Sequence, residues 1–174
     1  MTAEAAITGI LTHLKTLTLT PQYTIATSFD IVAAFDSMLY QAILNNAKNL
    51  QLPPYLQNLL HSYLHNRIVE YNGIRYKPEK GCPQGSVLRP QIWNIGYDPV
   101  LQVLSTLVHA TYFADNTMVI LSTPSLENLQ RKFESLMEMY TRLLSTIAVE
   151  LNIHKTEILF IPGCLPYTEY PTFT

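Results

Sequence analysis

The stretch "TYFADNTMVI", residues 111–120, decides how this chain is interpreted. Apolar and β-branched residues on both sides of an acidic pair are typical of two strands joined by a tight turn. The pair reads Asp115-Asn116, so one of its two positions carries an amide instead of a carboxylate. It is either a metal-binding acidic cluster with one member altered or an ordinary loop between strands.

The composition indicates a globular protein. The chain has 174 residues, of which 48% are hydrophobic and 14% are charged, enough to bury the core of one domain. A formal net charge of −2 excludes a chain that is basic overall, so any contact with phosphates has to come from a local cluster. Cys82 and Cys164 form no CxxC pair, which favours a reducing, intracellular setting, with nucleus and cytoplasm both open. We see no secretory signal and expect no membrane association.

Hydrophobic periodicity predicts an α+β fold in which helices pack on one face of a mainly antiparallel sheet. Asn72-Gly73 lies between two strand-like runs and predicts a hairpin with a type I′ turn. A long amphipathic stripe after Ser125 predicts a helix whose apolar face is core. Helices are expected over residues 5–16, 37–50, 55–66 (after Pro53-Pro54), 91–107 (interrupted before Pro99) and 126–147, and strands over 22–35, around the hairpin, on both sides of Asp115, and over 156–161.

Two aspartates stand where buried strands end. Asp30 and Asp115 each follow apolar residues, and a carboxylate in such a place is costly unless it meets a cation or a donor. Carboxylates are the hard ligands that Mg²⁺ prefers. Two ions about 3.5–4 Å apart can activate an attacking oxygen and stabilise a leaving one. For Asp30 alone, a helix cap or an ion pair is the plainer explanation.

The loop "KGCPQGSVLRP", residues 80–90, is more specific than either acidic group. Glycines such as Gly81 and Gly85 allow a backbone to approach a ligand closely, and Gln84 supplies both a donor and an acceptor. Taken alone, the same composition also suits a simple turn between hairpin and helix.

The order FDIVAAFD, GCPQGS, FADN and LNIHKTEILF resembles the palm of a reverse transcriptase, specifically that of non-LTR (LINE-type) retrotransposons. "LPPYLQNLLHSYLHNRIVEYN" and "VLRPQIWN" between these motifs are also similar to that family. The resemblance covers about residues 23–161, and residues 1–174 are expected to form a single palm-like domain. It implies a polymerase palm fold in which fingers and thumb are largely missing from this stretch.

The resemblance implies roles for residues of the acidic site. Asp30 and Asp115 match metal ligands, and Ile31 matches a position that lends its backbone carbonyl to a metal. Lys155 matches a candidate general acid for the departing pyrophosphate, although a lone lysine is more often a solvated charge. The family's second motif C aspartate is Asn116 here, so weaker metal binding is expected, because its amide offers a neutral oxygen and donors.

Further roles concern the nucleotide. Phe35 matches an aromatic steric gate against the ribose 2′-hydroxyl, and Gln84 and Gly85 match positions lining the nascent base pair and template. Asp36 matches a second family aspartate, for which a structural role is expected. Arg89 stands where the family commonly has a small residue, and either a phosphate contact or a surface salt bridge would suit it.

The implied reaction is template-directed addition of deoxynucleotides to a primer 3′-hydroxyl, with two Mg²⁺ (or Mn²⁺) ions as cofactors. The implied partners are an RNA template, a DNA primer and dNTPs, with possible association through surfaces left bare by missing fingers and thumb. The alternative is a catalytically dead remnant that acts as a nucleic-acid or protein interaction module, because of Asn116 and the absent regions. An unrelated α+β protein with accidental motifs is the third possibility.

Overall fold

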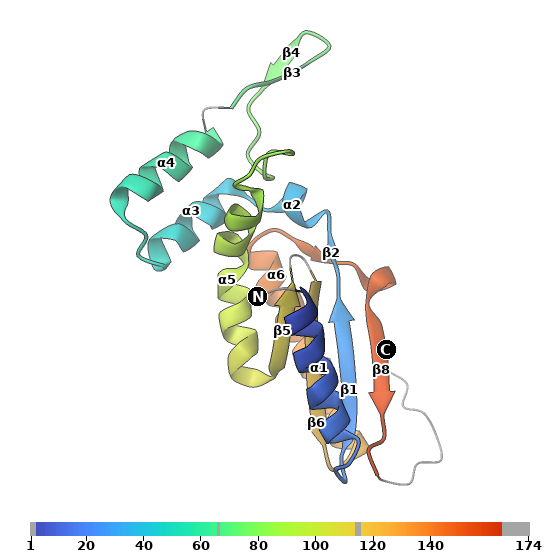
Figure 1. Cartoon of the computed structure of the whole chain (residues 1–174). Helices are drawn as coiled ribbons and strands as arrows, with labels where there is room; N and C mark the ends of the chain where they lie inside the picture. The colour runs from blue at the N-terminus through green and yellow to red at the C-terminus, as the bar shows by residue number, and fades with distance from the viewer. Residues whose placement is uncertain (1–2, 66, 114–115, 165–174) are drawn as a thin grey trace. The chain divides into compact units, whose positions relative to one another are not determined.

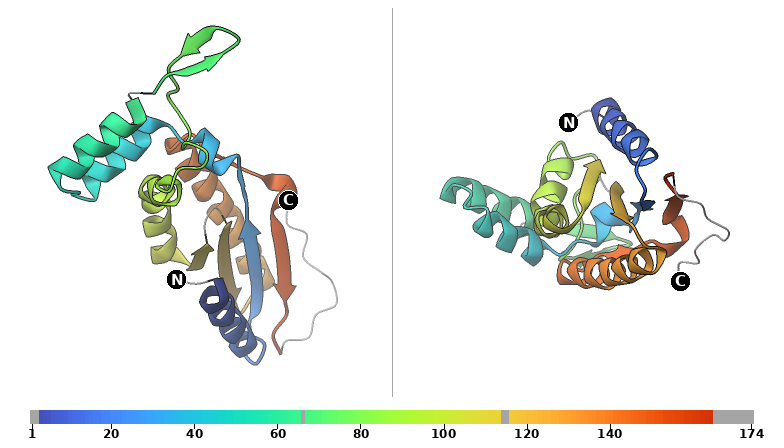
Figure 2. Two further views of the ribbon diagram at one scale, coloured as in Figure 1. Left: turned by 45° about the horizontal axis from the view of Figure 1, so that its top comes forward. Right: turned by 90° about the horizontal axis from the view of Figure 1, so that it is seen from below.

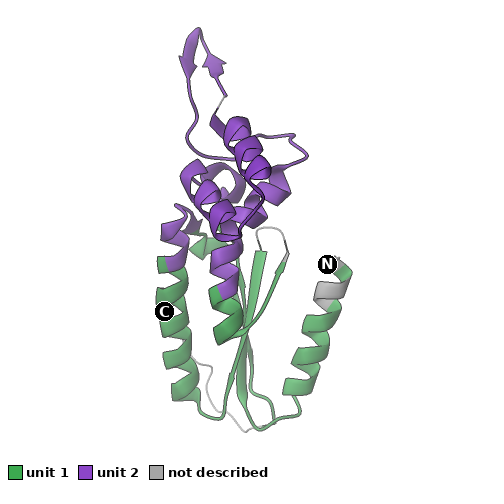
Figure 3. Ribbon diagram, turned by 90° about the vertical axis from the view of Figure 1, so that its left-hand side faces the viewer, with its two compact units in different colours: residues 1–31, 103–142, 151–174 green, residues 32–102, 143–150 purple. Residues whose placement is uncertain are grey.

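A computed structural model of the chain describes residues 3–65, 67–113 and 116–164. These residues form two compact units, coloured separately in Figure 3. The first unit comprises residues 1–31, 103–142 and 151–174, and the second comprises residues 32–102 and 143–150. Each is described by itself.

The first unit is built on a four-stranded antiparallel sheet (Figure 1). Its strands, in the order β5-β6-β1-β8, are His109–Phe113, Asn116–Thr123, Tyr23–Phe29 and Glu157–Ile161. The central strand β1 pairs with β6 from Tyr23↔Thr123 to Phe29↔Thr117. It pairs on its other side with β8, where Ser28 stands opposite Glu157. The predicted strand pair on either side of Asp115 is β5 and β6, which confirms an antiparallel sheet.

Helices lie on both sides of this sheet (Figure 2). The long helix α6 (Leu126–Thr146) covers one face, where the ring centroid of Phe29 lies 4.6 Å from that of Tyr140. The N-terminal helix α1 (Ala3–Leu17) lies on the opposite side and contacts β5. The predicted stripe of α6 is core, because its central apolar side chains are buried: Leu129, Phe133, Leu136, Tyr140 and Leu144.

The second unit is mainly helical. It contains α2 (Ala34–Ser37), α3 (Tyr40–Asn49), α4 (Pro54–His65) and the first part of α5 (Arg89–Leu107). Its core includes the fully buried side chains of Met38, Ile43, Leu64, Ile92, Trp93 and Tyr97. At Gly96 a methyl group would collide with the sulfur of Met38, so any larger residue there would require the Met38 side chain to move.

The predicted hairpin is present in the second unit. Strands β3 (Val69–Tyr71) and β4 (Ile74–Tyr76) pair antiparallel, and Asn72 and Gly73 between them both have positive φ, 50° and 77°. Positive φ at both central residues is what a type I′ turn requires.

Some element boundaries were predicted wrongly. The strand expected over residues 22–35 ends at Phe29, and only Ile31–Val32 (β2) continues as a strand before α2 begins. The interruption expected before Pro99 is absent, because α5 runs from residue 89 to residue 107 with Pro99 inside it. A proline lacks only its own N–H donor, and here the flanking turns continue the helix.

Besides α2, two short elements were not predicted. The strand β7 (Glu150–Leu151) pairs with β2, and a single turn of 3₁₀-helix (Ile153–Lys155) leads into β8. Within the described part of the chain, no helix combines the length and the apolar character that crossing a membrane requires.

Candidate functional site

Asp30 is the first residue after β1. Its side chain contacts Asn152 and Lys155, which are the N-cap residue and the last residue of the 3₁₀ turn before β8. Asn152 donates from its backbone N–H to the Asp30 carbonyl at 2.8 Å and from its side-chain amide to Asp30 Oδ2 at 3.0 Å. Lys155 Nζ lies 3.7 Å from the same oxygen. The Asp30 side chain is 19% exposed and that of Lys155 is 70% exposed, so the carboxylate is partly buried while its counter-ion reaches in from solvent.

The sheet register brings the second motif to the same end of β1. The last pair of the β1–β6 ladder is Phe29 and Thr117, so Asp30, which follows Phe29, and Asn116, which precedes Thr117, come directly after that pair at the same end of the ladder. Asn116 is exposed and pairs with Phe113 across the β5–β6 connection. Asp115 lies outside the described residues and falls in sequence between these paired positions. Ile31, the residue after Asp30, is the first residue of β2, and its side chain is buried.

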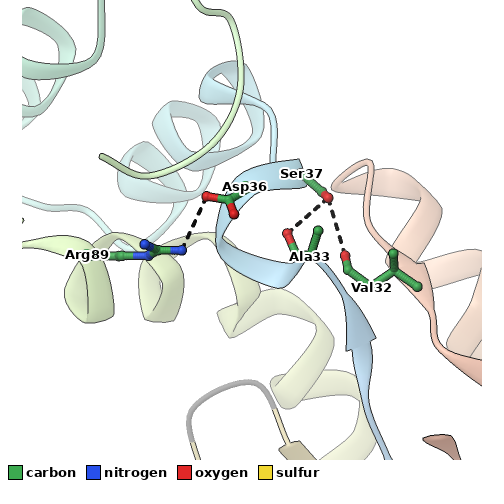
Figure 4. A network of polar contacts seen from close by, with 5 residues as sticks. All are labelled: Val32, Ala33, Asp36, Ser37 and Arg89. Atoms are coloured by element: carbon green, nitrogen blue, oxygen red, sulfur yellow. Dashed lines mark hydrogen bonds and ion pairs between the residues drawn. The ribbon is translucent and has the colours of Figure 1, made fainter. Parts of the chain in front are cut away.

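In the second unit, Phe35 and Asp36 lie on α2 and contact the first turns of α5. The Arg89 guanidinium carbon lies 4.7 Å from the Phe35 ring centroid, and Arg89 Nη2 lies 3.2 Å from Asp36 Oδ1. The Trp93 ring centroid lies 5.4 Å from that of Phe35. Figure 4 shows the ion pair beside the hydrogen bonds from the Ser37 hydroxyl to the carbonyls of Val32 and Ala33. The sequence suggested either a phosphate contact or a surface salt bridge for Arg89, and the structure shows a salt bridge, with Asp36.

The start of the glycine-rich loop is tied to the segment that carries Phe35. The Gly81 N–H donates to the Met38 carbonyl at 2.9 Å, and the Cys82 N–H donates to the Phe35 carbonyl at 2.6 Å. Gly81 has φ +84°, and a Cβ there would lie 2.9 Å from the Asp36 carbonyl oxygen. Only glycine therefore fits without strain.

The later part of this loop is open. Gln84 and Gly85 are exposed, and Gly85 has φ +76° with open space, free of other atoms to 4 Å, where a methyl group would stand. The loop ends at Ser86, whose hydroxyl accepts from Tyr63 at 2.6 Å and from the Leu88 N–H at 3.1 Å. Gln84 and Gly85 are thus free to meet a ligand, while the two ends of the loop are anchored.

The Cys82 thiol, at the start of this loop, has a strongly shifted pKa. Burial raises the pKa of its thiol to about 11, opposed by the positive charge of Arg89 and reinforced by the negative charge of Asp36. The thiol is therefore neutral at physiological pH and is a poor nucleophile. The Cys82 side chain is buried in the core of the second unit.

Two residues that contact candidate site residues, Asn152 and Trp93, were not predicted from the sequence. Asn152 precedes the lysine in "LNIHKTEILF", but nothing local distinguishes it from an ordinary turn residue. Trp93 follows Arg89 by four residues, the spacing at which two helical side chains share one face. That spacing was the available signal, since it places both side chains beside the same neighbour.

The chemistry of the acidic site suits a hard divalent cation. The partly buried Asp30 carboxylate, backbone carbonyls and the Asn116 side chain are oxygen donors of the kind that Mg²⁺ and Mn²⁺ accept. Among the residues that the structure describes, no three His, Cys, Asp or Glu side chains converge.

The family model described as "Reverse transcriptase (RNA-dependent DNA polymerase)" matches residues 2–170. The chain belongs to the reverse transcriptase family. Its relatives include a putative 115 kDa protein of the type-1 retrotransposable element R1DM of Drosophila melanogaster, 29% identical over 148 residues. They also include the RNA-directed DNA polymerase of the mobile element jockey from the same organism, 26% identical over 145 residues. The predicted resemblance to reverse transcriptases of LINE-type elements is thereby confirmed.

This reverse transcriptase segment spans a small part of those relatives. The alignments cover 83% and 77% of this chain but only 14% and 16% of the respective relatives. Among solved structures, telomerase from Candida tropicalis in complex with a fragment of telomeric RNA superposes with a TM-score of 0.69, at 16% identity over 91% of this chain and 29% of that one. Apo telomerase from the same organism, truncated from its C-terminal domain, gives a TM-score of 0.66 over 98% of this chain and 36% of that one. These matches confirm the predicted palm fold.

Proposed function

We propose that this chain is the palm segment of an RNA-directed DNA polymerase, in which it supports template-directed addition of deoxynucleotides to a primer 3′-hydroxyl. The observation that carries the proposal is the position of Asp30. It directly follows the central strand, lies at the same end of the β1–β6 ladder as Asn116 of motif C, and has Lys155 Nζ 3.7 Å from its Oδ2. Three motifs far apart in sequence thus gather at one end of one sheet.

Within this site, Asp30 and Asp115 would hold the metal, with the carbonyl of Ile31 as a further ligand. Two Mg²⁺ or Mn²⁺ ions, when bound, would supply charge stabilisation at the attacking and leaving oxygens. Lys155 would donate a proton to the departing pyrophosphate, because its exposed ammonium group is within reach of the acidic site. Asn116 would add a neutral oxygen in place of an anion and so weaken the metal site.

The second unit would handle the nucleotide. Phe35 would exclude the ribose 2′-hydroxyl, a role that suits a ring in contact with Arg89 and Trp93 on a residue whose backbone carbonyl accepts from the Cys82 N–H. Gln84 and Gly85 would line the nascent base pair, and their exposure supports a contact with a ligand. Here catalysis would consist chiefly of positioning the reacting groups.

The proposed partners are an RNA template, a DNA primer and dNTPs. The net charge of −2 gives this chain little general attraction for phosphates, so other parts of a longer protein or other chains would have to supply it. The second unit has an apolar hollow along α4 and α5 that could receive such a part. It is lined by Leu52, Leu56, Leu59, Leu60, Tyr63, Leu88, Gln91, Ile92 and Ile95.

A second candidate function is that of an inactive remnant that retains only binding. Asn116 in place of a carboxylate supports it. So does the environment of Asp30, whose Oδ2 is already occupied by the Asn152 amide and approached by Lys155. These partners can stabilise the carboxylate without a metal.

Calorimetric titration with Mn²⁺ tests the metal site first. The chain, Asp30→Asn and Asn116→Asp are compared, because each substitution changes one charge with little change of shape. We expect weak binding by the chain, tighter binding by Asn116→Asp, and none by Asp30→Asn. Equal binding by Asp30→Asn and the parent chain would overturn the assignment of Asp30.

Extension of a DNA primer annealed to an RNA template, measured with this chain joined to the fingers and thumb regions of a relative, separates the two candidate functions. If the chain is a polymerase palm, Asn116→Asp extends the primer more than the parent, and Asp30→Asn does not extend it. If metal binding depends on Asp30 but no variant extends the primer, the inactive remnant is the correct function for this chain.

A further inference from the structure

The Arg89 side chain makes two distinct contacts with α2. Its guanidinium carbon stands 4.7 Å from the Phe35 ring centroid, and its Nη2 forms an ion pair with Asp36 at 3.2 Å. The side chain is only 23% exposed, whereas that of Asp36 is 69% exposed. Stacking on a ring and bonding to a carboxylate at once is what the planar guanidinium does better than any other cation.

The position of Arg89 on its own helix does not explain this conformation. Arg89 is the first residue of α5, and a cation at a helix N-terminus is disfavoured by the helix dipole. Its neighbour on the same helical face, Trp93, also contacts Phe35, with ring centroids 5.4 Å apart. The first two turns of α5 therefore present two side chains to one ring.

The helix that carries Phe35 is poorly fixed by its own structure. α2 has four residues and is preceded by Ala33 at its N-cap, which adopts a left-handed conformation (φ 44°) and makes no side-chain capping bond. So short a helix gains little from internal hydrogen bonds. External ties therefore decide where the Phe35 ring lies. They include the Arg89 contacts, the Trp93 ring and, on the backbone, the Cys82 N–H bond to the Phe35 carbonyl.

We propose that Arg89 is a positioning residue that fixes the Phe35 ring, with Asp36 holding the guanidinium in place. It follows that Arg89 sets the discrimination between deoxyribonucleotides and ribonucleotides, a consequence that rests on the proposed function. A loosely held ring would tolerate the extra hydroxyl group, because the steric exclusion depends on a fixed edge.

Fluorine NMR tests the positioning without any need for activity. The chain is labelled with 4-fluorophenylalanine at its six phenylalanines, and the Phe35 signal is assigned with Phe35→Leu. We expect that signal to shift and broaden in Arg89→Met and, although Arg89 is still present, in Asp36→Asn. Arg131→Met, which breaks the exposed pair with Glu127 on α6, should leave it unchanged. An unchanged signal in both Arg89→Met and Asp36→Asn overturns the proposal.

The ratio of dNTP to rNTP incorporation tests the consequence. In the primer-extension assay, Arg89→Met should lower the ratio of the two kcat/KM values by about threefold or more, Arg89→Lys should lower it less, and Arg131→Met should leave it unchanged. A uniform loss of rate with the ratio intact would show that Arg89 is merely structural. If no variant extends the primer, the proposed polymerase function fails, and the NMR result still decides whether Arg89 positions Phe35.

Discussion

Asn152 binds Asp30 twice, through its backbone N–H to the Asp30 carbonyl at 2.8 Å and through its side-chain amide to the carboxylate at 3.0 Å. The residues are 122 positions apart in the chain. The pair joins the end of the central strand to the turn that precedes β8. It orients the candidate metal ligand from both its main chain and its side chain.

Asn152→Ala removes the side-chain bond and keeps the main-chain bond. A hydrogen bond to a charged group of limited exposure contributes about 1–3 kcal/mol, so we expect the free energy of unfolding in urea to fall by about that amount. His154→Ala, at an exposed position two residues on, is the matched control and should change it by less than about 0.5 kcal/mol. Equal losses in both variants would show that the Asn152 amide contributes nothing.

Gly81→Ala and Gly85→Ala form a second matched pair. Both glycines have positive φ, +84° and +76°, but only at Gly81 does an added methyl group meet a neighbour, the Asp36 carbonyl oxygen at 2.9 Å. Both variants lose about 1 kcal/mol to the left-handed conformation, and Gly81→Ala should lose clearly more in thermal or urea unfolding. Equal destabilisation would mean that the loop moves to admit the methyl group.

We expect the protein to lose stability at alkaline pH because its Cys82 thiol is buried. Burial raises the pKa of its thiol from 9.0 to about 11, so the unfolded chain releases this proton first as the pH rises. The stability that the neutral buried thiol contributes is fully present below about pH 9 and is lost progressively up to about pH 11. The free energy of unfolding of the parent should therefore fall more steeply over that window than that of Cys82→Ala. Parallel curves for the two proteins would contradict the shift.

Lys155→Met should strengthen the binding of Mn²⁺. The ammonium group lies 3.7 Å from Asp30 Oδ2 and repels a cation there, but its 70% exposure lets solvent screen the effect. We expect the dissociation constant to fall by only about two- to fivefold, and by less at high salt. Lys132→Met on α6 removes the same charge elsewhere and serves as the control. Weaker binding by Lys155→Met would place the lysine among the groups that support the metal.

The parts of the fold that depend on local patterns were predicted well. The Asn72-Gly73 turn was foreseen because two adjacent residues that tolerate positive φ admit few other conformations. The buried stripe of α6 was foreseen because apolar residues recur at helical spacing over its length. The uninterrupted α5 was not, since the rule that proline ends a helix takes no notice of the packing of Trp93 and Tyr97 on the same helix.

For the candidate site, the sequence identified residues but not their partners. Asp30, Phe35 and Lys155 were named from motifs. The pairing of Lys155 with Asp30 and the contact of Arg89 with Phe35 came only with the structure. Asn152 carried no signal at all, because an asparagine before a turn is common for purely local reasons.

The sequence by itself determined the family, the order of helices and strands, and which residues could carry chemistry, because periodicity, turn preferences and motif spacing act over short stretches of chain. Only the tertiary structure decided what surrounds each of those residues. The β1–β6 pairing places Asp30 and Asn116 at the same end of the sheet, and Asn152 and Lys155, just before β8, contact the Asp30 carboxylate. Such partners are set by the pairing of distant segments, which buries one face of the sheet and so admits one register.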